Sequence, residues 1–336
     1  MRTYLMILLL AIIAGFNLAA EPVMILPVAN LSHDGQVTKF YGISALQDAH
    51  AAAVSGDVIT LTSGTYNGCT ITKGITLRGA CMGATPEMAE QGMRPTVINN
   101  EMHIQVPRTD TNALRIEDLC FFSNLYVDSV PHISLERVKT KINLFTYGNI
   151  TYFDALQCRF RSIMANVSSS STAYTFVNSA ISFPGTTYYL PSHISADHCV
   201  IGDFYKSSSI SYSCMFKNCI FTYYRISLPN GCTAVNCVAV NNSIFSGCDV
   251  IDCKTAGMAE LFDDQNTSFQ FGDYVNPLTE EAAVTYLGTD GSQVGIYGGI
   301  FPFTMLPNNT IVTNCDIANK PDEDGKLRVR IEVRSN

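Results

Sequence analysis

Short runs of β-branched and aromatic residues recur about every 20 residues through the middle of the chain, separated by polar and turn-forming residues. The runs align on a series of residue pairs: Leu119-Cys120, Val138-Lys139, Gln157-Cys158, Asn178-Ser179, His198-Cys199, Asn218-Cys219, Asn236-Cys237 and Asp252-Cys253. Most of these pairs are followed by apolar residues. A β-rich unit that repeats at this period is typical of a solenoid, so the pattern predicts an all-β fold, a single right-handed parallel β-helix of about 20 residues per coil.

A second column of cysteines accompanies the first, because Cys214, Cys232 and Cys248 each lie five residues before a cysteine of the repeat. In an unbroken strand, positions five apart point to opposite faces. Both columns can face the core only if the chain bends between them. The residue at the bend is Asn or Asp in these coils, and these residues tolerate the left-handed backbone conformation. We therefore expect a corner in each coil, two inward columns of thiols, and stacked Asn side chains about 4.8 Å apart that hydrogen-bond to one another.

The two ends of the repeat differ from its middle. The segment 42–54, GISALQDAHAAAV, predicts a helix with a small or apolar face that Ser44 caps, and it would cover the open core before the first strand. Residues 258–336 break the repeat with a Gly-rich stretch, Gly288–Gly299, and then an alternating pair of segments, Thr310–Ile317 and Lys326–Val333, that predicts a hairpin which closes the other end. We therefore expect one domain, with the β-helix over residues 21–257 and a cap over 258–336.

Residues 1–20 have the pattern of an export signal, with Arg2 before the apolar stretch Leu5–Phe16 and small residues before Glu21. The apolar stretch is shorter than the ~20 residues of a membrane span. No cysteine precedes Cys69, so we expect no lipoprotein anchor. The sequence predicts a mature chain without a membrane span that resides in the periplasm, on the cell surface or outside the cell.

The net charge of −8 and the absence of Lys/Arg runs argue against a nucleic-acid partner, because phosphate binding needs a basic surface. The same charge mildly disfavours anionic polysaccharides, although a local basic groove could still bind one.

The stretch Leu46–Gly79, with Gly56-Asp57-Val58-Ile59-Thr60-Leu61 and Ile75-Thr76-Leu77-Arg78-Gly79, resembles the opening of right-handed β-helix proteins of the pectate-lyase-like superfamily. The Gly-rich region at Gly288–Gly299 resembles the end of many exported β-helix proteins from Bacteroidales-type bacteria. The resemblance implies a β-helix and no particular activity, because the superfamily includes lyases, hydrolases, esterases, adhesins and proteins of unknown role.

The acidic clusters and the Ca²⁺-binding aspartates of enzymes in that superfamily do not recur here. Asp263-Asp264 lies outside the repeat and is interpreted as a solvated loop. A divergent lyase or hydrolase for an acidic polysaccharide stays open as an alternative. Its candidate residues, expected on adjacent coils with Asp203 one coil from Arg161, are Arg161, Asp203, Lys206 and Arg225. The favoured expectation is a non-catalytic protein that binds glycan or another surface component or acts as a rigid scaffold.

Histidine, cysteine and tyrosine give weaker indications. His193 and His198 could form a metal or acid–base pair, but His198 occupies the corner position of its coil, which favours a turn residue. The twelve cysteines are interpreted as buried free thiols in preference to disulfides, and least of all as metal ligands, so we expect no metal and no cofactor. Tyr188, Tyr189, Tyr223 and Tyr224 follow strand runs and could line a sugar-binding groove, although packing is the favoured role.

Overall fold

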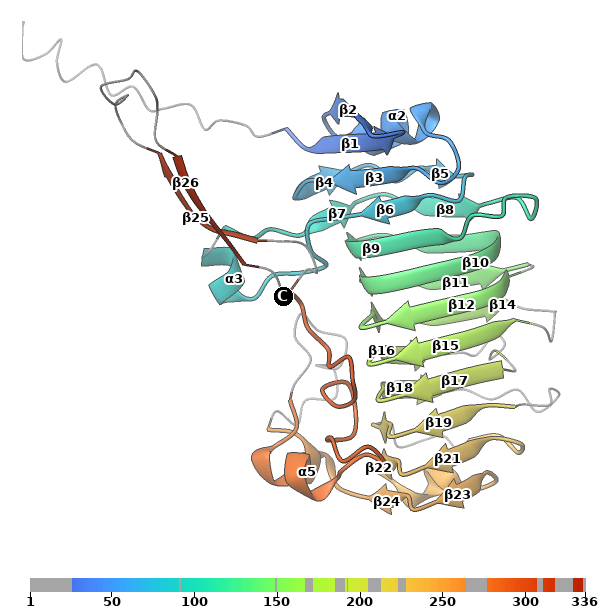
Figure 1. Ribbon diagram of the computed structural model, residues 1–336. Helices are drawn as coiled ribbons and strands as arrows, with labels where there is room; N and C mark the ends of the chain where they lie inside the picture. The colour runs from blue at the N-terminus through green and yellow to red at the C-terminus, as the bar shows by residue number, and fades with distance from the viewer. Residues whose placement is uncertain are drawn as a thin grey trace, which may run out of the picture.

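The computed structural model of the protein describes residues 26–90, 92–148, 150–166, 172–184, 191, 193–204, 213–222, 228–263, 277–306, 311–317 and 329–334. The chain forms a parallel β-solenoid, as the repeat predicts, and its coils are stacked in one direction (Figure 1). The predicted signal segment 1–20 lies outside the described residues, as do Lys206, Arg225 and the four tyrosines proposed to bind sugar.

Each coil contributes short strands to three faces of the solenoid, which we call the first, second and third face in the order in which the chain passes through them. The first face contains β3 (Val58–Leu61), β6 (Thr76–Arg78), β9 (Leu114–Phe121), β10 (Leu125–Thr140), β12 (Ile150–Leu156), β15 (Ala173–Val177), β17 (His193–Asp197), β19 (Met215–Lys217), β21 (Thr233–Val235) and β23 (Asp249–Ile251). The second face contains β4 (Gly64–Tyr66), β7 (Thr96–Ile98), the ends of β9 and β10, β13 (Arg159–Phe160), β16 (Ala180–Phe183), β18 (Val200–Phe204), β20 (Ile220–Phe221), β22 (Val238–Ala239) and β24 (Lys254–Thr255). A third, shorter face contains β5 (Thr70–Ile71), β8 (Met102–Gln105), the start of β10, β11 (Leu144–Tyr147) and β14 (Ile163–Asn166).

In-register pairing stacks equivalent side chains into columns that fill the interior. One first-face column runs through Ile116, Leu135, Ala155, Phe176, Ala196, Phe216 and Ala234, and all of these side chains are buried. Large and small residues alternate along this column from Leu135 to Ala234, so that neighbouring layers interdigitate at high packing density. Strand alternation places the next residue of each strand outside, where many positions are polar or charged, such as Ser134, Thr175 and Lys217.

The predicted corner is present in eight successive coils, each with one residue of positive φ. These residues are Asp118, Arg137, Gln157, Asn178, His198, Asn218, Asn236 and Asp252, with φ between 46° and 57°. Asn and Asp are several-fold enriched in this conformation, whereas Arg and Gln are unusual in it. The corner lets both thiol columns face the core, and Cys214, Cys219, Cys232 and Cys237 are buried, as expected.

The register expected for the first two coils is wrong by one residue. The corners there are Asp118 and Arg137, so Leu119 and Val138 occupy the inward position and pair with each other. Cys120 pairs with Lys139 on the outward side of the second face. The error arose because Cys120 was aligned with Cys158, although the inward residue of its coil is Leu119.

The N-terminal end of the solenoid is closed by a hairpin and a helix. β1 (Val28–His33) pairs antiparallel with both β3 and β2 (Gln36–Tyr41), and the two-residue turn Asp34-Gly35 has positive φ at both positions. The helix α2 (Ala45–Ala52) buries Leu46 and Ala49 against these strands, which confirms the predicted helical cap. Its N-cap, Ser44, makes no side-chain hydrogen bond, so that expected contact is absent.

The C-terminal end of α2 is held by the Lys73 side chain and by the backbone N–H of Thr72. Lys73 Nζ donates to the carbonyl oxygens of His50, Ala51 and Ala53, which satisfies carbonyls that the helix end leaves free. The Thr72 N–H donates to His50 Nε2 at 3.2 Å, and this bond requires a neutral imidazole.

Burial of the ring, reinforced by the Lys73 ammonium, lowers the pKa of His50 to about 4. An unfolded chain titrates this group near 6.5, so between these two values the unfolded state takes up a proton that the folded state does not. We expect the free energy of unfolding to fall by roughly 2–3 kcal/mol through this group as the pH drops from about 7 to 4. Urea denaturation of the protein and of His50→Gln, which keeps an acceptor for Thr72, measures the difference. An equally steep pH dependence in the variant would contradict the assignment.

A segment far along the chain lies over the row of corners. Residues 287–303, which we call the strap, run along the edge between the first and second faces, beside β16, β18 and β22 (Figure 1). Five successive corner side chains bind it. Asn236 Nδ2 donates to the Leu287 carbonyl (2.6 Å), and Asn218 Oδ1 accepts from the Thr289 N–H (2.9 Å). His198 Nε2 lies 3.2 Å from Ser292 Oγ, and Asn178 Nδ2 donates to the carbonyls of Ile296 (2.8 Å) and Gly298 (2.6 Å). Gln157 Nε2 donates to the carbonyls of Phe301 (3.3 Å) and Pro302 (2.7 Å).

This docking changes the expected role of the corner amides. A direct amide-to-amide bond links Asn236 Nδ2 to Asn218 Oδ1 at 3.3 Å. Asn178 instead bonds to strap carbonyls. The corners therefore do not form the expected continuous column of Asn side chains that hydrogen-bond to one another. The physical reason is that a left-handed corner directs its side chain outward, where buried strap carbonyls require donors.

Close contact with the corners requires glycine in the strap. At Gly298 a Cβ would collide with the Gln293 carbonyl oxygen and lie 2.7 Å from the His198 ring. At Gly295, where φ is +78°, it would lie 2.6 Å from Ile220. The Gly-rich stretch thus serves to bring backbone against the solenoid edge.

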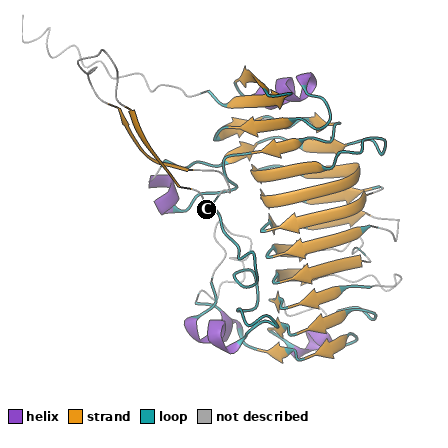
Figure 2. Cartoon of the chain, in the orientation of Figure 1, coloured by secondary structure: helices purple, strands orange, loops and turns teal. Residues whose placement is uncertain are grey.

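The C-terminal part otherwise contains short helices and one hairpin. The 3₁₀ helix η1 (Asn242–Phe245) lies between β22 and β23, and α4 (Met258–Leu261) and α5 (Glu280–Thr285) follow the last coil. The helix α3 (Pro86–Glu90) belongs to an insertion between β6 and β7. β25 (Ile311–Ile317) and β26 (Val329–Arg334) pair antiparallel, as the predicted hairpin requires. This pair lies on the side of α3 and away from the last coil, so it does not close that end (Figures 1 and 2).

The strap should contribute measurably to stability through Asn178. Asn178→Ala removes two hydrogen bonds to buried carbonyls and places alanine in the left-handed region, so we expect a loss of about 3 kcal/mol in the free energy of unfolding. Asp252→Ala is the matched control, because Asp252 has the same backbone conformation at an exposed corner and should lose only about 1 kcal/mol. Equal losses in chemical denaturation would show that the strap bonds contribute nothing.

Candidate functional site

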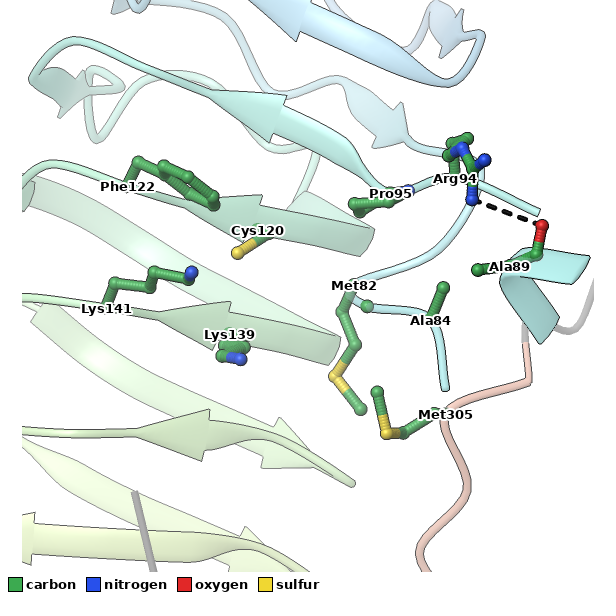
Figure 3. Close-up of a pocket in the computed structure, with 11 residues that line it drawn as sticks. Met82, Ala84, Ala89, Arg94, Pro95, Cys120, Phe122, Lys139, Lys141 and Met305 are labelled. Carbon is green, nitrogen blue, oxygen red and sulfur yellow. Dashed lines mark hydrogen bonds between the residues drawn. The ribbon is translucent and has the colours of Figure 1, made fainter. Parts of the chain in front are cut away.

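A pocket of about 280 Å³ opens on the second face where the insertion between β6 and β7 leaves the solenoid (Figure 3). Its lining residues are Met82, Gly83, Ala84, Ala89, Arg94, Pro95, Cys120, Phe122, Lys139, Lys141 and Met305. Outward positions of two neighbouring coils supply Cys120, Phe122, Lys139 and Lys141, because they alternate with the inward residues Phe121 and Thr140. Met305, just beyond the strap, lies beside Met82 in the pocket wall (Figure 3).

The pocket concentrates positive charge on an acidic protein. Arg94, Lys139 and Lys141 line it, and no carboxylate is among its lining residues. Lys141 Nζ lies 4.1 Å from the centroid of the Phe122 ring, a cation–π arrangement. Arg161 adjoins the pocket, since its Nη1 donates to the Lys141 carbonyl at 3.3 Å.

This arrangement fits a small anionic group. Cationic side chains bind carboxylate, sulfate or phosphate oxygens by charge-assisted hydrogen bonds. The volume lies just below the ~300–1,000 Å³ typical of ligand pockets, so the pocket would hold one charged unit of a larger molecule. Among the described residues that line it there is neither a carboxyl nor an imidazole, the groups that form the acid–base pair in glycoside hydrolysis.

Of the four residues proposed for catalysis, the structure describes Arg161 and Asp203, while Lys206 and Arg225 lie outside the described residues. Ser182 of β16 lies between Arg161 and Asp203, because β16 pairs with β13 on one side and with β18 on the other. The two residues are therefore two coils apart and not one, as expected from the sequence. Asp203 Oδ1 is buried without a hydrogen-bond partner among the described residues, and burial raises the pKa of this carboxyl.

A second pocket, of about 270 Å³, lies beside His198 under the strap. His198 Nδ1 lies 2.9 Å from Asp197 Oδ1, and its Nε2 lies 3.2 Å from Ser292 Oγ, in the order of a catalytic triad. The Ser292 hydroxyl, however, donates to Asp290 (2.8 Å) and accepts from the Gly299 N–H (2.6 Å). The arrangement therefore attaches the strap to its corner and does not activate a nucleophile. His193 lies at the exposed start of β17.

Two groupings were not anticipated from the sequence. On the third face the rings of His103, Tyr126 and Phe145 stack at centroid distances of 4.5 and 4.9 Å. Their faces cover one another, so they present ring edges and do not form an open platform for a sugar. The signal for this stack was the shared outward position of these residues in successive coils.

The other grouping is a chain of ion pairs at the first two corners. Arg115 lies 2.8 Å from Glu136, and the buried Arg137 contacts Glu136 and Asp118 at 2.5 and 2.7 Å. Burial acts to raise the pKa of Glu136, but hydrogen bonds from Arg115 and Arg137 outweigh it and hold that pKa below its usual range. Such mutually satisfied charges are most simply structural.

The described cysteines are free thiols. Eight of the eleven are buried, and burial raises the pKa of Cys69, Cys81 and Cys248 to about 11 and that of Cys158 to about 12. Thiols with such pKa values are poor nucleophiles at neutral pH. In the described ranges, no group of three or more His, Cys, Asp or Glu side chains is arranged to hold a metal ion.

Comparison with protein-family models, with curated proteins and with solved structures finds no match for this chain. Within the part of the chain that the structure describes, no helix has the length and apolar character needed to cross a bilayer.

Thiol titration tests the cysteine assignment. In denaturant without reductant we expect at least eleven thiols to react with a disulfide reagent, because that number is free in the structure. Without denaturant the reaction should be much slower, since most of the groups are buried. Prior reduction is the control and should not change the denatured count; an increase on reduction would reveal disulfides.

Proposed function

We propose that this protein is an exported β-solenoid of the pectate-lyase-like type, related to the Bacteroidales-type exported β-helix proteins, that binds an anionic glycan without acting on it. The observation that carries the proposal is the pocket lined by Arg94, Lys139 and Lys141. The rest of the solenoid serves as a rigid scaffold that holds this pocket at a surface of the cell envelope.

The charge distribution supports binding of an acidic ligand despite the net charge of −8. A local cationic pocket in an acidic protein attracts an anion at short range, while repulsion by the remaining surface restricts where that anion can bind. Uronic acid and sulfated sugars present a compact anionic group on an apolar ring face, and the pocket offers cations beside Phe122. Arg161 at its border extends the cationic surface toward the next sugar unit.

Titration of the mature chain with uronic-acid and sulfated oligosaccharides, with neutral oligosaccharides in parallel, tests the proposal. Lys141→Glu should weaken binding by roughly 10- to 100-fold, because a charge-assisted hydrogen bond contributes about 1.5–3 kcal/mol. Arg108→Glu makes the same charge change at an exposed position outside the pocket and should change affinity little. Equal losses in the two variants would contradict pocket binding and leave only a general effect of net charge.

A turnover assay on the same anionic polymers separates binding from catalysis. We expect no product. Product that appears with the wild-type chain and disappears in Arg161→Ala would replace the binding role with the alternative of a divergent polysaccharide lyase or hydrolase that acts on an acidic polysaccharide.

A further inference from the structure

Within the part of the chain that the structure describes, the last coil leaves the interior of the solenoid partly uncovered. Val250 continues the buried first-face column directly after Ala234, yet it is 46% exposed where Ala234 is fully buried. On the second face Thr255 follows the buried Ala239 and is also exposed. Among the described residues, β23 pairs with β21 alone and β24 with β22 alone, so both sheets end in free edges. We call this end the tail.

The opposite end, which we call the head, also exposes apolar side chains. Val37 and Tyr41 on β2 and Ile43 after it are 58%, 62% and 58% exposed. The outer edge of β2 is the first edge of the sheet, because among the described strands β2 pairs with β1 alone. Monomeric proteins usually protect such edges, and a β-solenoid with apolar residues at both free edges is prepared for strand addition.

The two free edges match in direction and register. β1 is antiparallel to both β2 and β3, and every later first-face strand is parallel to β3, so β2 and β23 run the same way. The column that ends at Val250 begins at the other end with Leu31 and then Thr38 on β2. Placing the tail of one copy on the head of another would therefore continue the parallel pairing of the first face without a change of strand direction.

Charge favours this arrangement over a tail-to-tail pair. On the first face the head strand carries Lys39, whereas the tail carries Asp249 on β23 and Asp252 at its corner; Lys254 of the tail lies on β24 in the second face. Head-to-tail stacking brings Lys39 toward these carboxylates. A two-fold tail-to-tail pair would instead place Asp249 of each copy near Asp252 of the other, and like charges at an interface are unfavourable.

We propose that copies of this chain associate head to tail, with β23 of one copy pairing in parallel with β2 of the next. Such an interface uses two different surfaces and does not close on itself, so it builds an open filament. Each copy contributes twelve first-face strands from β2 to β23, which gives an axial repeat of about 58 Å at about 4.8 Å per strand.

Sedimentation velocity of the mature chain over a range of concentrations, with negative-stain microscopy, tests the proposal. We expect the average mass to rise continuously with concentration and the particles to be rods with the stated repeat. Val250→Lys at the tail and Lys39→Glu at the head should each hold the chain at the monomer mass. Met215→Lys is the matched control, since Met215 is 52% exposed on the side of the solenoid and should leave assembly unchanged.

Mixing the two blocked variants distinguishes the possible interfaces. Head-to-tail association predicts that each variant alone is monomeric. Their mixture should form a dimer and nothing larger, because the intact tail of Lys39→Glu binds the intact head of Val250→Lys and both outer ends of that dimer are blocked. A dimer formed by Lys39→Glu alone would establish tail-to-tail pairing and overturn the proposal. A wild-type chain that stays monomeric at concentrations of about 100 μM, far above a typical specific dissociation constant, would also overturn it.

Discussion

The left-handed backbone conformation at one residue in each coil is the constraint on which the rest of the structure depends. It turns the chain between the first and second faces, so residues five apart can both point inward. It also directs the corner side chain outward, where Asn178, Asn218 and Asn236 hold the strap. An ordinary extended residue at these positions would reverse the facing of every following side chain. One backbone state thus determines both the filling of the core and the docking of a segment more than 50 residues distant.

The sequence predicted the features that repeat and missed those that join distant segments. Coil length, inward thiols and the helix before the first strand leave a local pattern of residue types, and each was found as expected. The strap contacts leave no such pattern, because the corner amides mostly bond to backbone carbonyls, which every residue possesses. The basic pocket combines Met82, Lys139 and Met305 from three separate regions, and only register information places them together. The alignment of Cys120 with Cys158 failed because identity of residue type was taken for identity of position.

The conspicuous chemistry of the chain is absorbed by its architecture. Thiols fill the interior, a serine–histidine–aspartate arrangement attaches the strap, and paired arginines and carboxylates occupy the first corners. The cationic residues of the pocket differ, because they occupy outward positions beside an insertion and are not needed to turn or close a coil. Function in this fold is therefore best sought where the repeat is interrupted.

The strap is itself periodic, with left-handed glycines at Gly291, Gly295 and Gly299, four residues apart. Because its attachment points follow successive corners, about four strap residues accompany each coil. Two repeats of very different length, one of about 20 residues and one of four, are thus matched to the same axial distance of about 4.8 Å. Lengthening such a protein by one coil would require a simultaneous four-residue insertion more than 50 residues downstream. Coil number under the strap is therefore expected to evolve by paired insertions, while the coils before Gln157 can vary alone.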